Sequence, residues 1–178
     1  MNGFIGVRGN KAPTIVLAFS GTEFFSAKNW ITNISQYFGH VDPVYLQAVG
    51  LLYSTRLGKS HRCIFKDATI EVYGHSLGGG LMQFSVACNR DKSVRGYGYN
   101  SAGIDLVNAN YFVYGDIPTI WHLYRRYDYV FKIPGTVQLG KSVASLGIDP
   151  KLITAHFISS IRRSAGKYHV GVAELASK

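Results

Sequence analysis

The pattern of apolar and polar positions divides the chain into short apolar runs and longer segments with helical spacing. Apolar runs over residues 3–8 and 14–19 are separated by Gly9-Asn10-Lys11, which predicts two strands joined as a hairpin. Three further runs of strand length, each followed by small or polar residues, cover residues 68–73, 94–99 and 120–124. These five runs predict the strands of one sheet.

Helical spacing appears in the segments between the strands. Apolar residues recur on one face of a helix that we expect over residues 27–38. A second helix is expected from Asp42-Pro43 to about residue 57, because aspartate caps free amides and proline fits the first turn. A third helix follows over residues 77–88. Strands that alternate with helices predict an α/β fold, with a mostly parallel sheet covered by helices on both faces.

The length and composition of the chain fit one domain. Its 178 residues are enough for a single hydrophobic core, so we assign one domain over residues 1–178. No apolar run is long enough to span a bilayer and no signal peptide is recognisable, which leaves a cytoplasmic location or export by a non-classical route. No cysteine and histidine residues have the spacing of a zinc site, and we expect neither a metal nor a cofactor.

The chain is basic, with a formal net charge of +9 at neutral pH. No nucleic-acid-binding motif accompanies this charge, so nucleic acid is not an expected partner. The charge is compatible with an ordinary solvated surface or with peripheral contact to an anionic membrane surface. Nothing in the pattern indicates an oligomeric state.

A serine lies among closely spaced glycines in EVYGHSLGGG, residues 71–80, where a predicted strand meets a predicted helix. Glycine stands two residues before and two residues after Ser76, as a sharp turn requires, because these positions approach each other closely. Such a turn lifts the hydroxyl above the sheet, toward the amide at the start of the next helix. No lysine follows with the spacing of a phosphate loop. The pattern therefore favours Ser76 as a nucleophile.

Four segments resemble, in the same order, the class 3 lipases, which is the family of the fungal triacylglycerol lipases. They are IVLAFSGTEFFSAKNWITNI over residues 15–34, the GHSLGG turn over residues 74–79, GYGYNSAGI over residues 96–104 and DYVFKIPG over residues 128–135. The resemblance extends from residue 3 to about residue 160, although Ser20 stands where the family often has arginine. It implies a compact α/β-hydrolase fold and hydrolysis of lipid esters.

A serine nucleophile needs a histidine base and an acid that orients the histidine, in the chain order serine, acid, histidine for this fold. Asp128 follows a predicted strand, at the sheet edge where catalytic loops gather, and it matches the family pattern. Asp105, which also follows a strand, is the alternative acid. The candidate bases after Asp128 are His156 and His169, and the resemblance favours His156.

Two groups are expected to stabilise the oxyanion that forms during acyl transfer. One is the amide of Leu77, which follows the nucleophile, and the resemblance implies Thr22 as the second. Residues 105–118 are aromatic, which is compatible with a lid or acyl-contact surface or with a packed connection. The expected function is that of a lipase or phospholipase with an acyl-enzyme on Ser76. The alternatives are an esterase or thioesterase for small soluble substrates, or a non-catalytic relative that binds lipid or protein.

Overall fold

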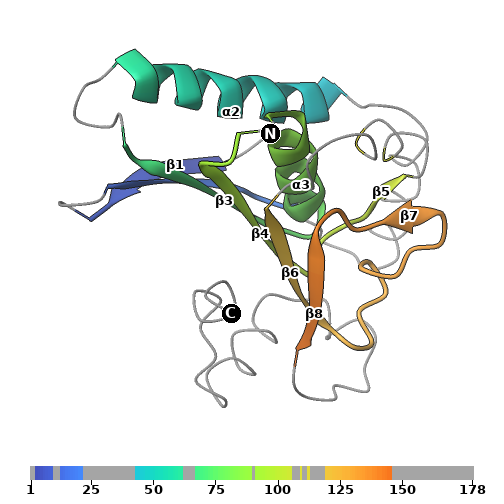
Figure 1. Cartoon of the computed structure of the whole chain (residues 1–178). Helices are drawn as coiled ribbons and strands as arrows, with labels where there is room; N and C mark the ends of the chain where they lie inside the picture. The colour runs from blue at the N-terminus through green and yellow to red at the C-terminus, as the bar shows by residue number, and fades with distance from the viewer. Residues whose placement is uncertain are drawn as a thin grey trace.

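The structure of the chain, a computed structural model, describes residues 3–9, 13–21, 43–61, 67–89, 91–105, 109, 112 and 119–145. Within this part of the chain a six-stranded sheet has the order β1-β2-β3-β4-β6-β8 (Figure 1). Its strands are β1 (Gly3–Arg8), β2 (Thr14–Phe19), β3 (Thr69–His75), β4 (Val94–Tyr99), β6 (Ile120–Arg125) and β8 (Lys141–Ser145). A two-stranded sheet pairs β5 (Ile104–Asp105) with β7 (Thr136–Val137).

The direction of the strands decides where catalytic groups can gather. β1 is antiparallel to β2, which confirms the predicted hairpin, and every other pair in the six-stranded sheet is parallel. β3 pairs with β4, and β4 pairs with β6, so the carboxyl ends of these three strands lie at the same edge. In open parallel sheets this edge carries the ligand-binding loops.

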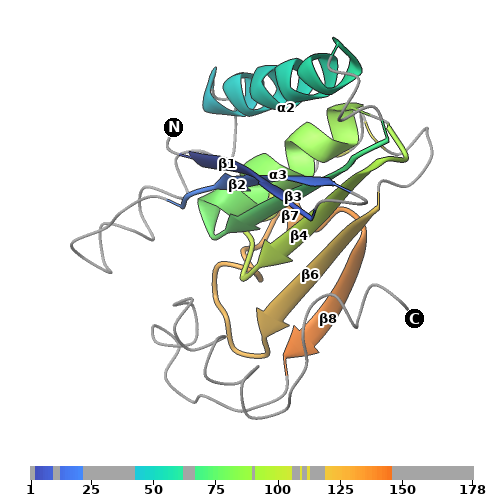
Figure 2. The ribbon, with the colours of Figure 1, turned by 90° about the vertical axis from the view of Figure 1, so that its left-hand side faces the viewer.

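Both described helices, α2 (Pro43–His61) and α3 (Leu77–Asn89), lie on one face of the sheet (Figure 2). α3 packs on β2, β3 and β4, and α2 packs against α3. Neither helix is long and apolar enough to cross a membrane. The core that these helices form with the sheet contains aliphatic and aromatic side chains, which include Leu17, Leu52, Ile70, Val72, Leu81 and Met82. The helix expected over residues 27–38 lies outside the described residues.

Most predicted elements are found, with small differences at their ends. β3 continues to His75 because Gly74 and His75 pair with Gly98 and Tyr99 of β4. β8 has serines at two of its five positions and little apolar pattern, and it is held by pairing with β6. Apart from Asp105, which forms β5 with Ile104, most of the candidate lid lies outside the described residues.

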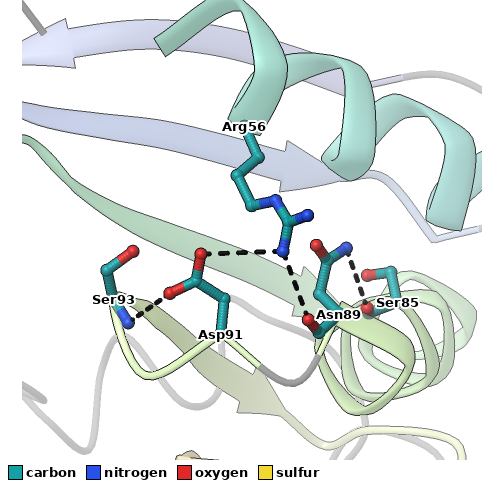
Figure 3. Close-up of polar contacts among 5 residues, drawn as sticks. All are labelled: Arg56, Ser85, Asn89, Asp91 and Ser93. Atoms are coloured by element: carbon teal, nitrogen blue, oxygen red, sulfur yellow. Dashed lines mark hydrogen bonds and ion pairs between the residues drawn. The ribbon is translucent and has the colours of Figure 1, made fainter. Parts of the chain in front are cut away.

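The carboxyl end of α3 is tied to α2 by polar contacts around Arg56 (Figure 3). The Arg56 guanidinium donates to the Asn89 carbonyl oxygen at 3.5 Å and lies 3.7 Å from a carboxylate oxygen of Asp91. Asp91 in turn accepts a hydrogen bond from the Ser93 amide at 2.8 Å. A cation next to the last carbonyls of a helix is favourable because these carry partial negative charge. The contacts therefore fix α2 against the helix that follows Ser76.

Candidate active site

Ser76 occupies the turn between β3 and α3 in a backbone conformation that serine rarely adopts. Its φ is +56°, in the left-handed region, which only two non-glycine residues of the described chain enter. Non-glycine residues in this region are strained by about 1–3 kcal/mol and persist where the surroundings hold them. The hydrogen bonds that hold this turn include one from the Ser76 amide to Tyr99 O at 3.2 Å and one from the Ala102 amide to Ser76 O at 2.8 Å. The strand-turn-helix geometry is that of a nucleophile elbow.

The glycines on either side of Ser76 are required by the space around the turn. A methyl group on Gly74 would overlap the carbonyl oxygen of Gly78, and one on Gly78 would overlap the carbonyl oxygen of Phe19. These overlaps involve backbone atoms, which cannot move aside as a flexible side chain can. The prediction that a tight turn needs small residues at these two positions is therefore confirmed.

The Ser76 side chain is enclosed, with 3% of its surface exposed. Its Oγ makes no hydrogen bond to any described residue. Buried hydroxyl groups in native proteins are nearly always hydrogen-bonded, because an unpaired one costs about 1–3 kcal/mol. An enclosed hydroxyl that has no partner in the described part of the chain fits a nucleophile whose base lies in another segment.

Of the two candidate oxyanion donors, Leu77 is among the described residues and Thr22 is not. Leu77 begins α3, so its amide is among the first amides of a helix, which have no carbonyl partner within the helix. Thr22 lies outside the described residues. Its neighbour Gly21 touches the elbow, since a methyl group on Gly21 would lie 2.9 Å from His75 O and 3.2 Å from Ser76 Cβ. The turn that leads to Thr22 therefore passes directly beside the nucleophile.

Asp128 lies just after β6, at the same edge of the sheet as Ser76 and two strands away from β3. It is fully buried, and its Oδ1 accepts a hydrogen bond from the Phe131 amide at 2.8 Å. Its own amide donates to Arg125 O at 2.9 Å. The alternative acid Asp105 is partly exposed in β5. Burial and backbone contacts thus hold the Asp128 carboxyl group in place, as an orienting acid requires.

The two candidate bases, His156 and His169, lie outside the described residues. His122 is described, and it belongs to the core: its side chain is 1% exposed and points toward α3. Its Nε2 donates to Leu139 O at 2.9 Å, because a carbonyl can only accept, and Nδ1 then accepts from Ser101 Oγ at 3.0 Å. Burial lowers the pKa of His122 to about 4, so the ring is neutral near pH 7. A histidine held on both nitrogens is not a base for Ser76.

The segment after β4 supports the elbow, a role that the sequence analysis did not assign to it. Asn100 has a positive φ of +42°, and its Oδ1 accepts from the Arg125 amide at 2.9 Å, which joins the ends of β4 and β6. Gln83 of α3 donates to Ala102 O at 2.6 Å and accepts from the Leu139 amide at 2.9 Å. Asparagine is among the few residues that tolerate positive φ. An asparagine directly after a predicted strand is therefore the sequence feature that could have indicated this turn.

Comparison with known proteins identifies the family of the chain. A family model described as a Tle-like phospholipase domain matches residues 4–115, which is more than half of the chain. The chain belongs to the Tle-like phospholipase domain family. An extracellular phospholipase A1 of Serratia liquefaciens is 36% identical to it over 95 residues. These residues are 53% of this chain and 26% of that protein, so this Tle-like domain spans about a quarter of that relative.

Solved structures similar to this Tle-like domain are fungal lipases. The lipase of Rhizopus microsporus var. chinensis has a TM-score of 0.60 and 23% identity, over 83% of this chain and 57% of its own. The triacylglyceride lipase of Rhizomucor miehei has a TM-score of 0.56 and 23% identity, over 80% of this chain and 62% of its own. The fold of the Tle-like domain is therefore an α/β-hydrolase fold, which confirms the class 3 lipase resemblance at the level of fold.

Proposed function

We propose that the chain hydrolyses carboxylic esters of lipids, with phospholipids as the principal substrates, through an acyl-enzyme on Ser76. The observation that carries the proposal is the elbow, where Ser76 stands in a left-handed conformation between two glycines that tolerate no side chain. A turn so constrained serves to present one hydroxyl group next to the first amides of a helix. Membership of a phospholipase domain family and the name of the Serratia relative support the choice of substrate.

The proposed reaction follows from the roles of the groups. The base, His156, takes the proton of Ser76 Oγ as this oxygen forms a bond to the ester carbonyl carbon. The tetrahedral intermediate then expels the alcohol, here a lysophospholipid, which leaves with the proton from His156. Water adds to the acyl-enzyme with the same base and releases the fatty acid. Asp128 holds the imidazole in the tautomer that can accept the proton.

In this proposal, two donors stabilise the charge on the intermediate. The amide of Leu77 is one donor, and the partial positive charge at the start of α3 adds to it. Thr22 is the second donor in this proposal, which the contact between Gly21 and the elbow supports. Removal of one such donor typically lowers the rate about a hundredfold to a thousandfold.

Parallel assays on one protein preparation distinguish phospholipid substrates from soluble esters and thioesters. The proposal expects fatty-acid release from phospholipid vesicles and micelles, with lower rates on soluble short-chain nitrophenyl esters and thioesters. Activity confined to soluble monomeric substrates would place the chain among the small-molecule esterases. A folded wild-type protein without turnover of any ester would support a binding role and contradict the proposal.

Matched variants test the assignment of the triad. Asp128→Asn and His156→Ala are expected to abolish turnover, whereas Asp105→Asn and His169→Ala serve as controls for the alternative residues. Circular dichroism and thermal unfolding establish that each variant is folded. If only His169→Ala abolishes turnover in a folded protein, the base is His169, and the same logic applies to Asp105.

A further inference from the structure

The turn that carries Asp128 displays two tyrosines and two cations to solvent. Tyr127 and Tyr129 are 43% and 48% exposed, and Arg126 and Lys132 are also exposed, while Asp128 is fully buried. We call these four exposed side chains, Arg126, Tyr127, Tyr129 and Lys132, the basic-aromatic turn. Tyrosine combines an apolar ring with a polar hydroxyl, and such residues gather where a protein meets the interface of a bilayer.

The exposed charges carried by this turn are both positive. Asp128 is the only carboxylate in the sequence from residue 117 to residue 148, and it is buried. Of the nearby cations, Arg126 and Lys132 are exposed in the turn itself, whereas Arg125 is buried and Lys141 lies beside Trp121, toward the other end of β6. Anionic lipids attract cations held near the membrane surface, and each basic residue strengthens binding on the order of fivefold. Exposed aromatic rings add buried apolar area to this electrostatic attraction, and binding at an interface increases with both.

The turn is also rigid and lies at the catalytic edge. The Phe131 ring stacks on Tyr124 of β6 at 3.8 Å between centroids, and the Lys132 amide donates to Tyr129 O at 3.1 Å. Together with the hydrogen bonds of Asp128, these contacts fix the backbone that displays both tyrosines. A preorganised surface loses little conformational entropy when it binds. β6 ends at the same edge of the sheet as β3, so the turn and the elbow that carries Ser76 lie at one edge.

We infer that the basic-aromatic turn docks the domain on an anionic phospholipid bilayer and thereby presents the bilayer to Ser76. The inference rests on the proposed function, because the bilayer is then both the docking surface and the source of substrate. Tyr53 on α2 is as exposed as Tyr129, but its neighbour Arg56 is engaged by Asp91 and Asn89.

The test measures binding separately from catalysis. Ser76→Ala protein is titrated with vesicles of phosphatidylcholine alone and of phosphatidylcholine mixed with phosphatidylglycerol, and bound protein is measured by sedimentation. Binding to the mixed vesicles is expected to be tighter and to weaken with salt. Adding Arg126→Ser and Lys132→Ser should weaken it on the order of twentyfold. Tyr127→Ser and Tyr129→Ser should weaken it further, through loss of ring insertion.

Two controls match these variants in exposure and chemistry. Tyr53→Ser removes an equally exposed tyrosine from α2, and Lys92→Ser removes an exposed cation at the amino end of β4. Both are expected to bind the mixed vesicles as the parent does. Equal binding by the turn variants and the controls would overturn the inference.

A gain-of-signal variant covers the case in which the combined turn variants do not fold. Tyr129→Trp is expected to show a blue-shifted emission and quenching by brominated lipids in mixed vesicles, whereas Tyr53→Trp is not. Absence of quenching at Tyr129 while the protein is bound to the vesicles would also overturn the inference. Hydrolysis of a soluble ester by wild-type protein is measured in parallel. Its failure would count against the proposed function and not against the docking surface.

Discussion

The buried imidazole of His122 makes the stability of the domain depend on pH. Burial lowers its pKa from the ordinary 6.5 to about 4, and its side chain is 1% exposed. Between these two values the unfolded chain binds a proton that the folded chain does not, so stability rises with pH. The stability that depends on a neutral His122 is fully present above about pH 6.5. It is lost as the pH falls toward 4. Each pKa unit corresponds to about 1.4 kcal/mol, so the loss is about 3 kcal/mol.

The assay compares wild-type protein with His122→Gln, whose side-chain amide keeps a hydrogen-bond donor and an acceptor but does not titrate. Urea unfolding at several pH values from 7 to 4 gives the free energy of unfolding of each protein. The carboxylates titrate in both proteins, so the difference between the two curves isolates His122. Wild type should lose about 3 kcal/mol more than the variant on acidification. Parallel curves would refute the assignment of a buried, neutral imidazole with a lowered pKa.

Three further substitutions test the packing around the site. Gly74→Ala places a methyl group against the Gly78 carbonyl oxygen, so we expect a loss of about 1–3 kcal/mol in urea unfolding and slower fluorophosphonate labelling. Ser101→Ala leaves the buried Nδ1 of His122 without its donor, and we expect a loss of about 1–3 kcal/mol by the same measurement. Arg56→Ala removes the cation at the end of α3, which should lower stability by at most about 1 kcal/mol and leave turnover unchanged.

The local signals in the sequence predict the framework of the fold. Apolar residues bounded by glycine and polar residues mark β2, β3 and β4, since buried parallel strands are rich in apolar residues, although Glu71 and Arg95 interrupt β3 and β4. β8 is harder to predict, since a five-residue strand with serines at two positions has little apolar pattern of its own. Its place depends on pairing with β6, which is a long-range contact that periodicity does not report.

The same difference between local signals and long-range contacts applies to the candidate site. The elbow is local, so spacing alone identified Ser76 and the two glycines beside it. The interactions of Ser101, His122 and Gln83 join segments that lie far apart in the chain, and no pattern within one segment indicates them. His122 looked like an ordinary strand residue, and its hydrogen-bond partners Ser101 and Leu139 come from two other segments. Thr22, His156 and His169 lie outside the described residues, so their roles stay predictions.

The central claim is that Ser76 is an activated nucleophile, and covalent labelling tests it most directly. A soluble fluorophosphonate is incubated with wild-type protein and with Ser76→Ala, and intact mass and peptide mapping locate the adduct. The account predicts one adduct on wild type, located on the peptide that contains Ser76, and none on the variant. A folded wild-type protein that stays unlabelled, or a variant labelled to the same extent, would contradict it.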